Sequence, residues 1–304
     1  MFWLSRALID KLEFFIAVAR EQSFSRAAEA CGVTQPTLSA GIKQLEETLG
    51  VLLVNRSSRF HGLTSEGERV LEWAKRIVGD SRAMRQEVRA LKSGLTGLMR
   101  IAVIPTALSM VAALTTPFRA KHPGVRFSVT SANSHEILQG ISNLEIDAGI
   151  TYLDNEPLGT VRSLPLYIEQ YRLLTSAGSP FADNKSVTWA EVGRIPLCLL
   201  TPDMQNRRIV DQLLASTGGA RPEPTLESNS VIALYAHVKT GQWASIMAEK
   251  LVETLSIAEP IRSIPIIEPQ AVHQIGLVVP RREPMTPLTA TLFAEAKKLI
   301  APRL

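Results

Sequence analysis

Apolar residues recur at intervals of three and four positions through the first third of the chain, which is the period of an amphipathic helix. The interval from Asp10 to Glu21 predicts one helix, whose inner face consists of Leu12, Phe15, Ile16 and Ala19. A second stripe with the same period consists of Leu38, Ile42, Leu45 and Leu49. This third of the chain is therefore expected to be helical.

Residues 23–49 contain the signals that begin and end two short helices. Ser23 can cap the first helix with its hydroxyl, and Gly32 can adopt the left-handed conformation that ends it. Thr34 can cap the second helix, and Pro36 falls in its first turn, where a missing N–H costs nothing. The pattern predicts a helix-turn-helix.

The polar residues of the second helix lie off its apolar stripe, and they are Gln35, Thr37, Ser39 and Lys43. Hydroxyl and amide groups near the start of such a helix suit contacts with base edges, and a lysine suits a phosphate. The alternative is that residues 23–49 are two ordinary amphipathic helices. We favour DNA recognition because the alanine pair, the glycine turn, Thr-Gln-Pro and the apolar stripe occur together.

A longer helix is predicted from Thr64 to Leu95. Thr64 can cap it, and Glu66 and Glu68 favour its positive end. Its apolar positions alternate by four and three residues, a heptad pattern that makes two helices wrap around each other. They are Val70, Ala74, Ile77, Ser81, Met84, Val88, Leu91 and Leu95. Because Ala74 and Ser81 weaken the pattern, a single helix packed on its own domain is the alternative.

From residue 98 the pattern changes to β-prone apolar runs separated by helical stretches. The expected strands are Met99–Ile104, Val125–Thr130, Ile146–Tyr152, Tyr171–Ser176, Ile195–Leu200, Trp243–Met247 and His273–Pro280. The expected helices are Ala107–Lys121, His135–Asn143, Met204–Thr217, Val231–Thr240 and Pro287–Ile300. This alternation predicts α/β layers around a mostly parallel sheet, and the length fits two such lobes with a cleft between them.

Length and charge extend this interpretation. A chain of 304 residues is expected to hold two or three domains. Residues 1–100 contain 15 lysines and arginines against 11 aspartates and glutamates, whereas residues 101–304 contain 18 of each kind. The whole formal excess of +4 therefore lies in the N-terminal third, where an anionic partner would bind.

The remaining composition argues against several classes of protein. No secretory signal and no stretch of roughly 18 uncharged apolar residues is visible, so a cytoplasmic location is expected. The two cysteines, Cys31 and Cys198, are expected to be small buried core residues of different domains. Together with five scattered histidines they form no metal-ligand spacing, and neither a metal nor a cofactor is expected.

The sequence shows no phosphate-binding glycine loop, no G-x-S-x-G elbow and no carboxylate pair typical of acid–base catalysis. We therefore expect no enzymatic activity. One alternative is a metabolic enzyme or a solute-binding protein with a fused helical head. The other is an architectural DNA-binding protein without an effector. Ligand turnover would distinguish an enzyme from a sensor, which returns its ligand unchanged.

The motifs of the first part of the chain are Leu12-x-Phe14-x3-Val18-Ala19, Ser23-Phe24-Ser25-x-Ala27-Ala28, Gln35-Pro36-x-Leu38-Ser39-x2-Ile42, Leu45-Glu46-x2-Leu49-Gly50, Arg56-x2-Arg59 and Leu63-Thr64-x2-Gly67. They resemble the N-terminal domain of LysR-type transcriptional regulators. Ala40 and Gly41 depart from the family, which often has a longer polar pair at these two positions, and both are expected to be exposed. A weaker resemblance in the second part rests on Pro117-Phe118-x3-His122-Pro123, Ile146-Asp147-Ala148-Gly149-Ile150, Trp189, Ile195-Pro196-Leu197 and Val278-Val279-Pro280.

The resemblance implies an N-terminal all-α winged helix-turn-helix, a long dimerisation linker helix and a C-terminal two-lobed α/β effector domain like that of periplasmic binding proteins. The expected boundaries are 1–63, 64–95 and 96–304, with lobe I at about 96–162 and 269–304 and lobe II at about 163–268. The wing would be Gly50–Gly62, with Arg56, Arg59 and His61 near the DNA backbone. The implied partners are double-stranded DNA, a small-molecule effector, further copies of the chain in a homodimer or a dimer of dimers, and RNA polymerase.

Two sets of site residues follow. The expected DNA-binding residues are Ser23, Ser25, Thr34, Gln35, Pro36, Thr37, Ser39, Lys43, Arg56 and Arg59. Small ligands of α/β folds lie at strand C-terminal ends beside helix N-termini, where free N–H groups favour an anion. The expected effector-binding residues are Thr106, Ala107, Asn133, Ser134, Thr151, Thr201, Pro202, Met204 and Asn229, each with an ordinary cap or turn role as its alternative. Arg207 and Arg208 could bind a carboxylate or be solvated.

Overall fold

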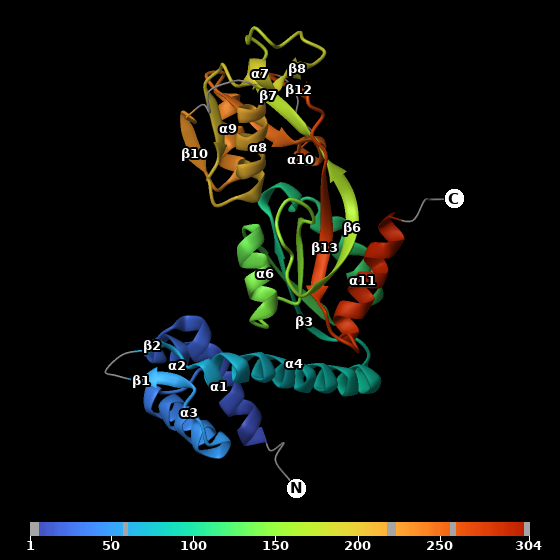
Figure 1. Cartoon of the computed structure of the whole chain (residues 1–304). Coiled ribbons are helices and arrows are strands. Elements are labelled where there is room, and N and C mark those ends of the chain that lie inside the picture. The colour runs from blue at the N-terminus through green and yellow to red at the C-terminus, as the bar shows by residue number, and fades with distance from the viewer. Residues whose placement is uncertain (1–5, 57–59, 218–222, 256–259, 301–304) are drawn as a thin grey trace. The chain divides into compact units, whose positions relative to one another are not determined.

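The computed structural model describes residues 6–56, 60–217, 223–255 and 260–300 (Figure 1). They form two compact units, one built mainly from Met1–Gly94 and the other mainly from Leu95–Leu304. We call the first unit the head and the second the C-terminal unit. Within the described ranges, no helix combines the length and the hydropathy that crossing a membrane requires.

The head is a helical bundle with a short β-hairpin (Figure 1). Its described elements are α1 (Arg6–Glu21), α2 (Phe24–Ala30), α3 (Gln35–Leu49), β1 (Val54–Arg56), β2 (Phe60–Leu63) and α4 (Ser65–Ser93). Strands β1 and β2 pair antiparallel. Gly32 between α2 and α3 and Gly50 after α3 both have a positive φ, 66° and 72°, which is why a glycine ends each of these helices.

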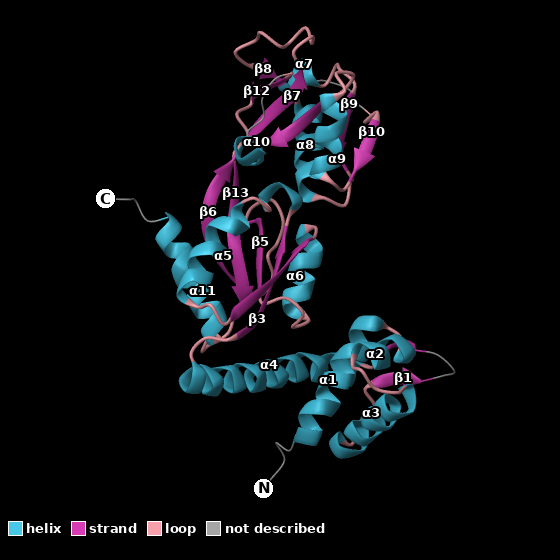
Figure 2. Cartoon of the chain, turned by 180° about the vertical axis from the view of Figure 1, so that it is seen from behind, coloured by secondary structure: helices cyan, strands magenta, loops and turns pink. Residues whose placement is uncertain are grey.

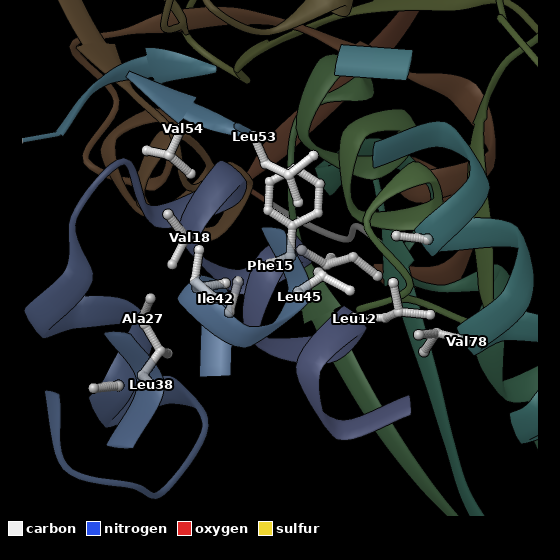
Figure 3. Packing of buried hydrophobic residues seen from close by; sticks show 14 of the residues in the cluster. Leu12, Phe15, Val18, Ala27, Leu38, Ile42, Leu45, Leu53, Val54 and Val78 are labelled. Atoms are coloured by element: carbon white, nitrogen blue, oxygen red, sulfur yellow. The ribbon is translucent and has the colours of Figure 1, made fainter. Parts of the chain in front are cut away.

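One apolar core holds the head together (Figure 3). Phe15 and Val18 of α1 meet Leu38, Ile42 and Leu45 of α3, and all five side chains are fully buried. Burial of a large apolar side chain stabilises the folded state by roughly 1.5–3 kcal/mol. The apolar stripes of the sequence are therefore the faces that pack together.

The two halves of α4 differ in what covers their apolar residues. In the first half, Ala74 and Val78 are fully buried and belong to the core of the head. In the second half, Met84, Val88 and Leu91 are 60%, 48% and 84% exposed. The start of α4 thus packs on its own domain, and its end presents an uncovered apolar row; pairing with a second helix along that row stays a prediction.

The first lobe of the C-terminal unit is a five-stranded sheet with strand order β4-β3-β5-β13-β6. Its strands are β3 (Gly97–Val103), β4 (Val125–Ser131), β5 (Ala148–Tyr152), β6 (Val161–Glu169) and β13 (His273–Pro280). Helix α6 (Ser134–Ser142) covers one face, and α5 (Met110–Lys121) and α11 (Pro287–Ile300) cover the other (Figure 2). A 3-10 turn, η1 (Pro105–Ala107), follows β3.

The second lobe is built on a sheet with strand order β10-β9-β11-β7-β12-β8. Its strands are β7 (Tyr171–Ser176), β8 (Val187–Thr188), β9 (Leu197–Leu200), β10 (Leu226–Ser228), β11 (Ala244–Ala248) and β12 (Ile261–Ile267). Its helices are α7 (Trp189–Val192), α8 (Gln205–Ser216), α9 (Val231–Lys239) and α10 (Glu249–Leu255). Only Gln170 separates β6 of the first lobe from β7 of the second, so the chain crosses between the lobes at this point.

The expectation of mostly parallel sheets is wrong, because both sheets are mixed. Strand β13 runs antiparallel to β5 and β6, and β7 runs antiparallel to β11 and β12. The apolar pattern does not predict β6 and β12, which contain Pro165 and Pro265, residues that weaken a strand pattern. Strand β6 pairs antiparallel with β13, and β12 pairs antiparallel with β7 and parallel with β8.

Candidate functional site

Helix α3 has one buried face and one polar face. Leu38, Ile42 and Leu45 are fully buried, whereas Gln35, Pro36, Thr37 and Lys43 are exposed and Ser39 is half-buried. The polar side chains are therefore available to a partner without disturbing the core. Lys43 also lies 3.8 Å from Glu47, an exposed pair that contributes little to stability.

Hydroxyl groups define the start of the two helices. The Ser23 hydroxyl accepts a hydrogen bond from the Arg26 N–H, and the Thr34 hydroxyl accepts one from the Thr37 N–H, both at 3.4 Å. These contacts give Ser23 and Thr34 the capping roles that their positions predict. The exposed Ser25 hydroxyl donates to the side-chain oxygen of Gln35 at 2.9 Å, so α2 orients the first side chain of α3.

Gly41 is buried, which corrects the expectation that it is exposed. A Cβ atom at this position would lie 2.8 Å from Cδ2 of Phe14 on α1. The glycine therefore allows α3 to approach α1 closely. Ala40 is exposed, as expected. The exposed Gln44 extends the polar face beside Lys43; it lies off the apolar stripe as well, although it is not among the predicted DNA-binding residues.

A buried carboxylate connects α3 to the hairpin. Glu46 is 5% exposed, and its Oε1 accepts hydrogen bonds from the N–H groups of Leu53 and Val54 at 2.9 and 3.3 Å. This contact fixes the position at which β1 begins. Arg56 ends β1, and His61 on β2 is exposed. Arg59 lies outside the described residues.

Buried polar side chains of the C-terminal unit gather where the two lobes meet. We call this set the interlobe cluster, and it consists of Thr106, Asn133, Ser134, Thr151, Tyr152, Glu169, Gln205 and Asn206, each at most 9% exposed. The Asn206 side-chain amide on α8 donates to the Tyr152 hydroxyl at 3.1 Å, and that of Gln205 donates to the Asp154 carbonyl at 3.0 Å. Asn133 also donates to the Asp203 carboxylate at 3.4 Å.

The structure brings together most of the residues expected to bind an effector. Thr106, Ala107, Asn133, Ser134 and Thr151 of the first lobe are buried at the ends of β3, β4 and β5. In the second lobe, Met204 is buried at the start of α8 and Thr201 is half-buried. Pro202 and Asn229 are exposed. Tyr152, which ends a predicted strand, was a candidate by position, whereas Glu169 and Asn206 were missed, because only the folded chain brings their positions together.

Glu169 is the buried acid of the cluster. It ends β6, has no exposed surface and accepts a hydrogen bond from the Tyr152 hydroxyl. Burial raises the pKa of Glu169 to about 7, although the hydrogen bond from Tyr152 and the nearby polar groups of Thr106 and Asn206 oppose the shift. Burial also raises the pKa values of Tyr152, Tyr167 and Tyr171, and the Glu169 charge adds to each shift. The three tyrosine hydroxyls therefore stay protonated at neutral pH.

Helix α8 begins without a side-chain cap. Met204 occupies the N-cap position, and no side chain accepts a hydrogen bond from the first turn. Arg207 is buried and paired with Asp211 at 2.8 Å and with Glu227 at 2.6 Å, so it is neither solvated nor free for a carboxylate. Arg208 pairs with Glu156 at 2.6 Å and joins the two lobes. The first N–H groups of α8 therefore have no side-chain cap, and they form the positive end of the helix dipole.

The two cysteines have ordinary protonated thiols. Cys198 on β9 is fully buried, as expected, whereas Cys31 is only half-buried at the end of α2. Burial raises the pKa of both thiols. Reactive cysteines have lowered pKa values, because the thiolate is the nucleophile. Among the described residues, no group of three or more histidine, cysteine or acidic side chains could hold a metal ion.

A pocket of about 550 Å³ lies at the opposite end of the first lobe from the interlobe cluster. It is lined by Val161, Arg162, Arg281, Arg282 and Glu283, which flank the start of β6 and the end of β13. Arg162 pairs with Glu283 at 3.2 Å. We place the candidate ligand site at the interlobe cluster instead, because buried polar groups from two lobes converge there.

Comparison with protein families assigns both parts of the chain. Residues 92–301 match the LysR substrate binding domain, and residues 9–68 match the bacterial regulatory helix-turn-helix protein, lysR family. The chain belongs to the LysR family of transcriptional regulators. Members of this family are regulators and not enzymes, so the enzymatic alternative is not favoured.

Relatives resemble this LysR-family chain over most of its length. A probable nitrogen assimilation transcriptional activator of Synechococcus elongatus is 25% identical over 279 residues, covering 90% of this chain and 89% of the relative. The DNA-binding transcriptional dual regulator OxyR of Escherichia coli strain K12 is 25% identical over 273 residues, covering 89% and 88%. Each of these alignments therefore spans both the helix-turn-helix part and the substrate-binding part of the chain.

Solved structures show the same fold. A full-length OxyR variant from Pseudomonas aeruginosa has a TM-score of 0.73 at 24% identity and covers 96% of this chain and 94% of its own. Full-length CbnR in complex with its target DNA has a TM-score of 0.59 at 21% identity and covers 96% and 99%. The expected fold class, a helical winged head followed by a two-lobed α/β effector-binding domain, is therefore confirmed.

Proposed function

We propose that the polar face of α3 recognises a specific DNA sequence and that the hairpin contacts the adjacent backbone. The DNA-binding set is the one predicted above, Ser23, Ser25, Thr34, Gln35, Pro36, Thr37, Ser39, Lys43, Arg56 and Arg59. The observation that carries the proposal is the exposed polar face of α3 opposite a fully buried stripe. Gln35, oriented by Ser25, would contact a base edge, and Lys43 would contact a phosphate.

We propose further that the chain works as a homodimer joined along the second half of α4, and that two dimers form a tetramer. Met84, Val88 and Leu91 supply an uncovered apolar row at heptad spacing. A twofold dimer would place two recognition helices on successive half-sites of DNA. A contact with RNA polymerase is also proposed, and family membership is its support. Residues 1–63, 64–95 and 96–304 would be the DNA-binding, linker and effector-binding parts.

The effector would bind between the lobes at the interlobe cluster. The uncapped N-terminus of α8 favours an anionic group of this ligand, because its N–H groups and helix dipole are positive. Hydrogen bonds connect the two lobes, and the effector would shift the balance between this arrangement and a more open one. Such a shift requires different affinities for the two states. It would change the spacing or bending of DNA held by paired heads.

Hydrogen peroxide is a poor fit as the signal, although several relatives are named as hydrogen peroxide-inducible genes activators. Cys31 and Cys198 lie in different units, and burial raises the pKa of both thiols. A peroxide-sensing cysteine needs a thiolate that solvent can reach. We expect the Cys31→Ser and Cys198→Ser variants to bind DNA like the parent chain, with or without peroxide. A peroxide response abolished by either substitution would contradict this.

The DNA proposal is tested by selecting bound sequences from a random DNA library and measuring affinity by fluorescence anisotropy. Gln35→Ala should lose about 1–3 kcal/mol on the selected site and relax the sequence preference. Lys43→Ala should weaken binding to all DNA sequences. It should also reduce the slope of log affinity against log salt concentration by about 1, the value for one phosphate contact. Gln212→Ala, an exposed change on α8, is the matched control. Selection that enriches no sequence would overturn the proposal.

The effector proposal is tested by DNase footprinting and DNA-bending assays on the same selected site. A ligand that raises the melting temperature of the C-terminal unit should also alter the footprint or the bend. A saturating ligand that changes neither would show that closure of the lobes is not the control mechanism.

A further inference from the structure

Glu169 lies at the crossing point between the lobes. It is the last residue of β6, one residue before β7 begins, and its side chain has no exposed surface. Its Oε1 accepts a hydrogen bond from the Tyr152 hydroxyl. The Tyr152 oxygen in turn accepts a hydrogen bond from the side-chain amide of Asn206 in the second lobe. A buried acid therefore ends a hydrogen-bond chain that runs from α8 into the first lobe.

This carboxylate has no protein cation as a partner. Among the described residues, no lysine, arginine or histidine forms an ion pair with Glu169, and its Oε2 has no hydrogen-bond partner. The groups that act on it are the Tyr152 and Thr106 hydroxyls, the Asn206 amide and the Asp154 carboxylate. Burying an unpaired carboxylate is costly, and such groups are normally paired or neutralised. When Glu169 is ionised, its negative charge therefore has no opposite charge among the described residues.

Further polar groups at the ends of the same strands also lack partners. The hydroxyls of Tyr167 and Tyr171, on both of which the Glu169 charge acts, are buried, and no hydrogen bond to them is present within the described part of the chain. More than nine-tenths of buried polar groups in proteins are hydrogen-bonded. A concentration of exceptions around one acid indicates groups that can serve a polar ligand.

We propose that the interlobe cluster binds a small molecule through a protonated amine, which pairs with Glu169 and lies between the lobes. This assignment deepens the effector site proposed above and rests on it. An ammonium group supplies three hydrogen-bond donors and the missing positive charge. The anionic group proposed for the start of α8 then belongs to the other end of the same ligand, so the effector is zwitterionic.

Binding of the amine requires Glu169 to be ionised, so affinity rises with pH until the carboxyl is fully deprotonated. The other titratable groups near the acid are Tyr152, Tyr167, Tyr171 and Asp154. His273 also lies close, with its ring centroid 6.2 Å from that of Tyr152 and Nδ1 3.5 Å from Asp154. A Glu169→Gln variant separates the contribution of the acid from that of the histidine.

The test uses the full-length chain and methylammonium chloride as the probe, with sodium chloride at equal ionic strength as the reference. At pH 8, a probe concentration near ten times its dissociation constant should raise the melting temperature by about 3 °C. Glu169→Gln should abolish the rise, and Glu169→Asp, which keeps the charge, should retain part of it. Glu253→Gln, the same change at an exposed position on α10, should respond like the parent chain.

An equal melting temperature in both salts, or an equal rise in Glu169→Gln, would overturn the inference. If Glu169→Gln does not fold, an undiminished response in Glu169→Asp would also overturn the inference. DNA binding by the head is measured on the same samples. If methylammonium does not raise the melting temperature while sequence-specific DNA binding is intact, the proposed amine site is wrong. The proposed regulator function would then still stand.

Discussion

The head and the interlobe cluster bury their side chains for different reasons. In the head, Phe15, Ile42 and Leu45 are fully buried apolar groups contributed by neighbouring helices. In the interlobe cluster, buried carboxyl, amide and hydroxyl groups from both lobes meet, and several lack a partner. The first arrangement stabilises a platform for polar residues on its surface. The second leaves polar groups inside the protein that a ligand can satisfy.

The largest change in stability is expected from truncating an apolar core residue of the head. Phe15→Ala should lower the free energy of unfolding of the head by about 3–5 kcal/mol, because it leaves a cavity in a fully buried core. Urea denaturation followed by circular dichroism measures the change. The control is Leu52→Ala, whose side chain is 65% exposed and which should change stability by less than about 0.5 kcal/mol. Similar effects of the two substitutions would contradict the packing described.

The next largest effect concerns the acid between the lobes. The pKa of Glu169 is raised from an ordinary 4.5 to about 7, so its protonated form favours the folded state. The stability it contributes is fully present below pH 4.5 and is lost as the pH rises through 7, a change of about 3 kcal/mol. Glu169→Gln should remove this component. Melting temperatures from pH 5 to 8.5 measure it, and identical slopes for parent and variant would refute the assignment.

A smaller effect is expected at the junction of α3 and the hairpin. Glu46→Ala removes the acceptor of the Leu53 and Val54 N–H groups and should cost about 2 kcal/mol. Glu47→Ala, at an exposed neighbouring position, should cost less than about 0.5 kcal/mol. Chemical denaturation compares the two variants. If Glu47→Ala were the more costly change, the carboxylate of Glu46 would not hold the hairpin.

The smallest effect tests the approach of α3 to α1. Gly41→Ala improves helix propensity by about 1 kcal/mol, but its Cβ would lie 2.8 Å from Phe14 Cδ2. We expect a net loss of about 1 kcal/mol, because overpacking outweighs propensity. In a Phe14→Leu background, where the ring is absent, the same change should become stabilising. A stabilising Gly41→Ala in the parent chain would show that the contact relaxes freely.

Sequence patterns were most informative where the structure is local. The caps at Ser23, Thr34 and Thr64 are present, because a cap depends on residues three positions apart. Tyr171–Ser176, His273–Pro280 and Pro287–Ile300 have the bounds that were expected. Strands β6 and β12 were missed, because each contains a proline and finds its pairing partner far away in the chain.

The sequence by itself determined the helix-turn-helix, the family and the alternation of strands and helices, since these depend on spacings within a few turns of chain. Only the tertiary structure decided that Gly41 is buried against Phe14 and that Arg207 is held in ion pairs. It also decided that Tyr152, Glu169 and Asn206 meet between the lobes. Side chains so far apart in the chain meet only when strand pairing closes both lobes, and no local pattern records that pairing.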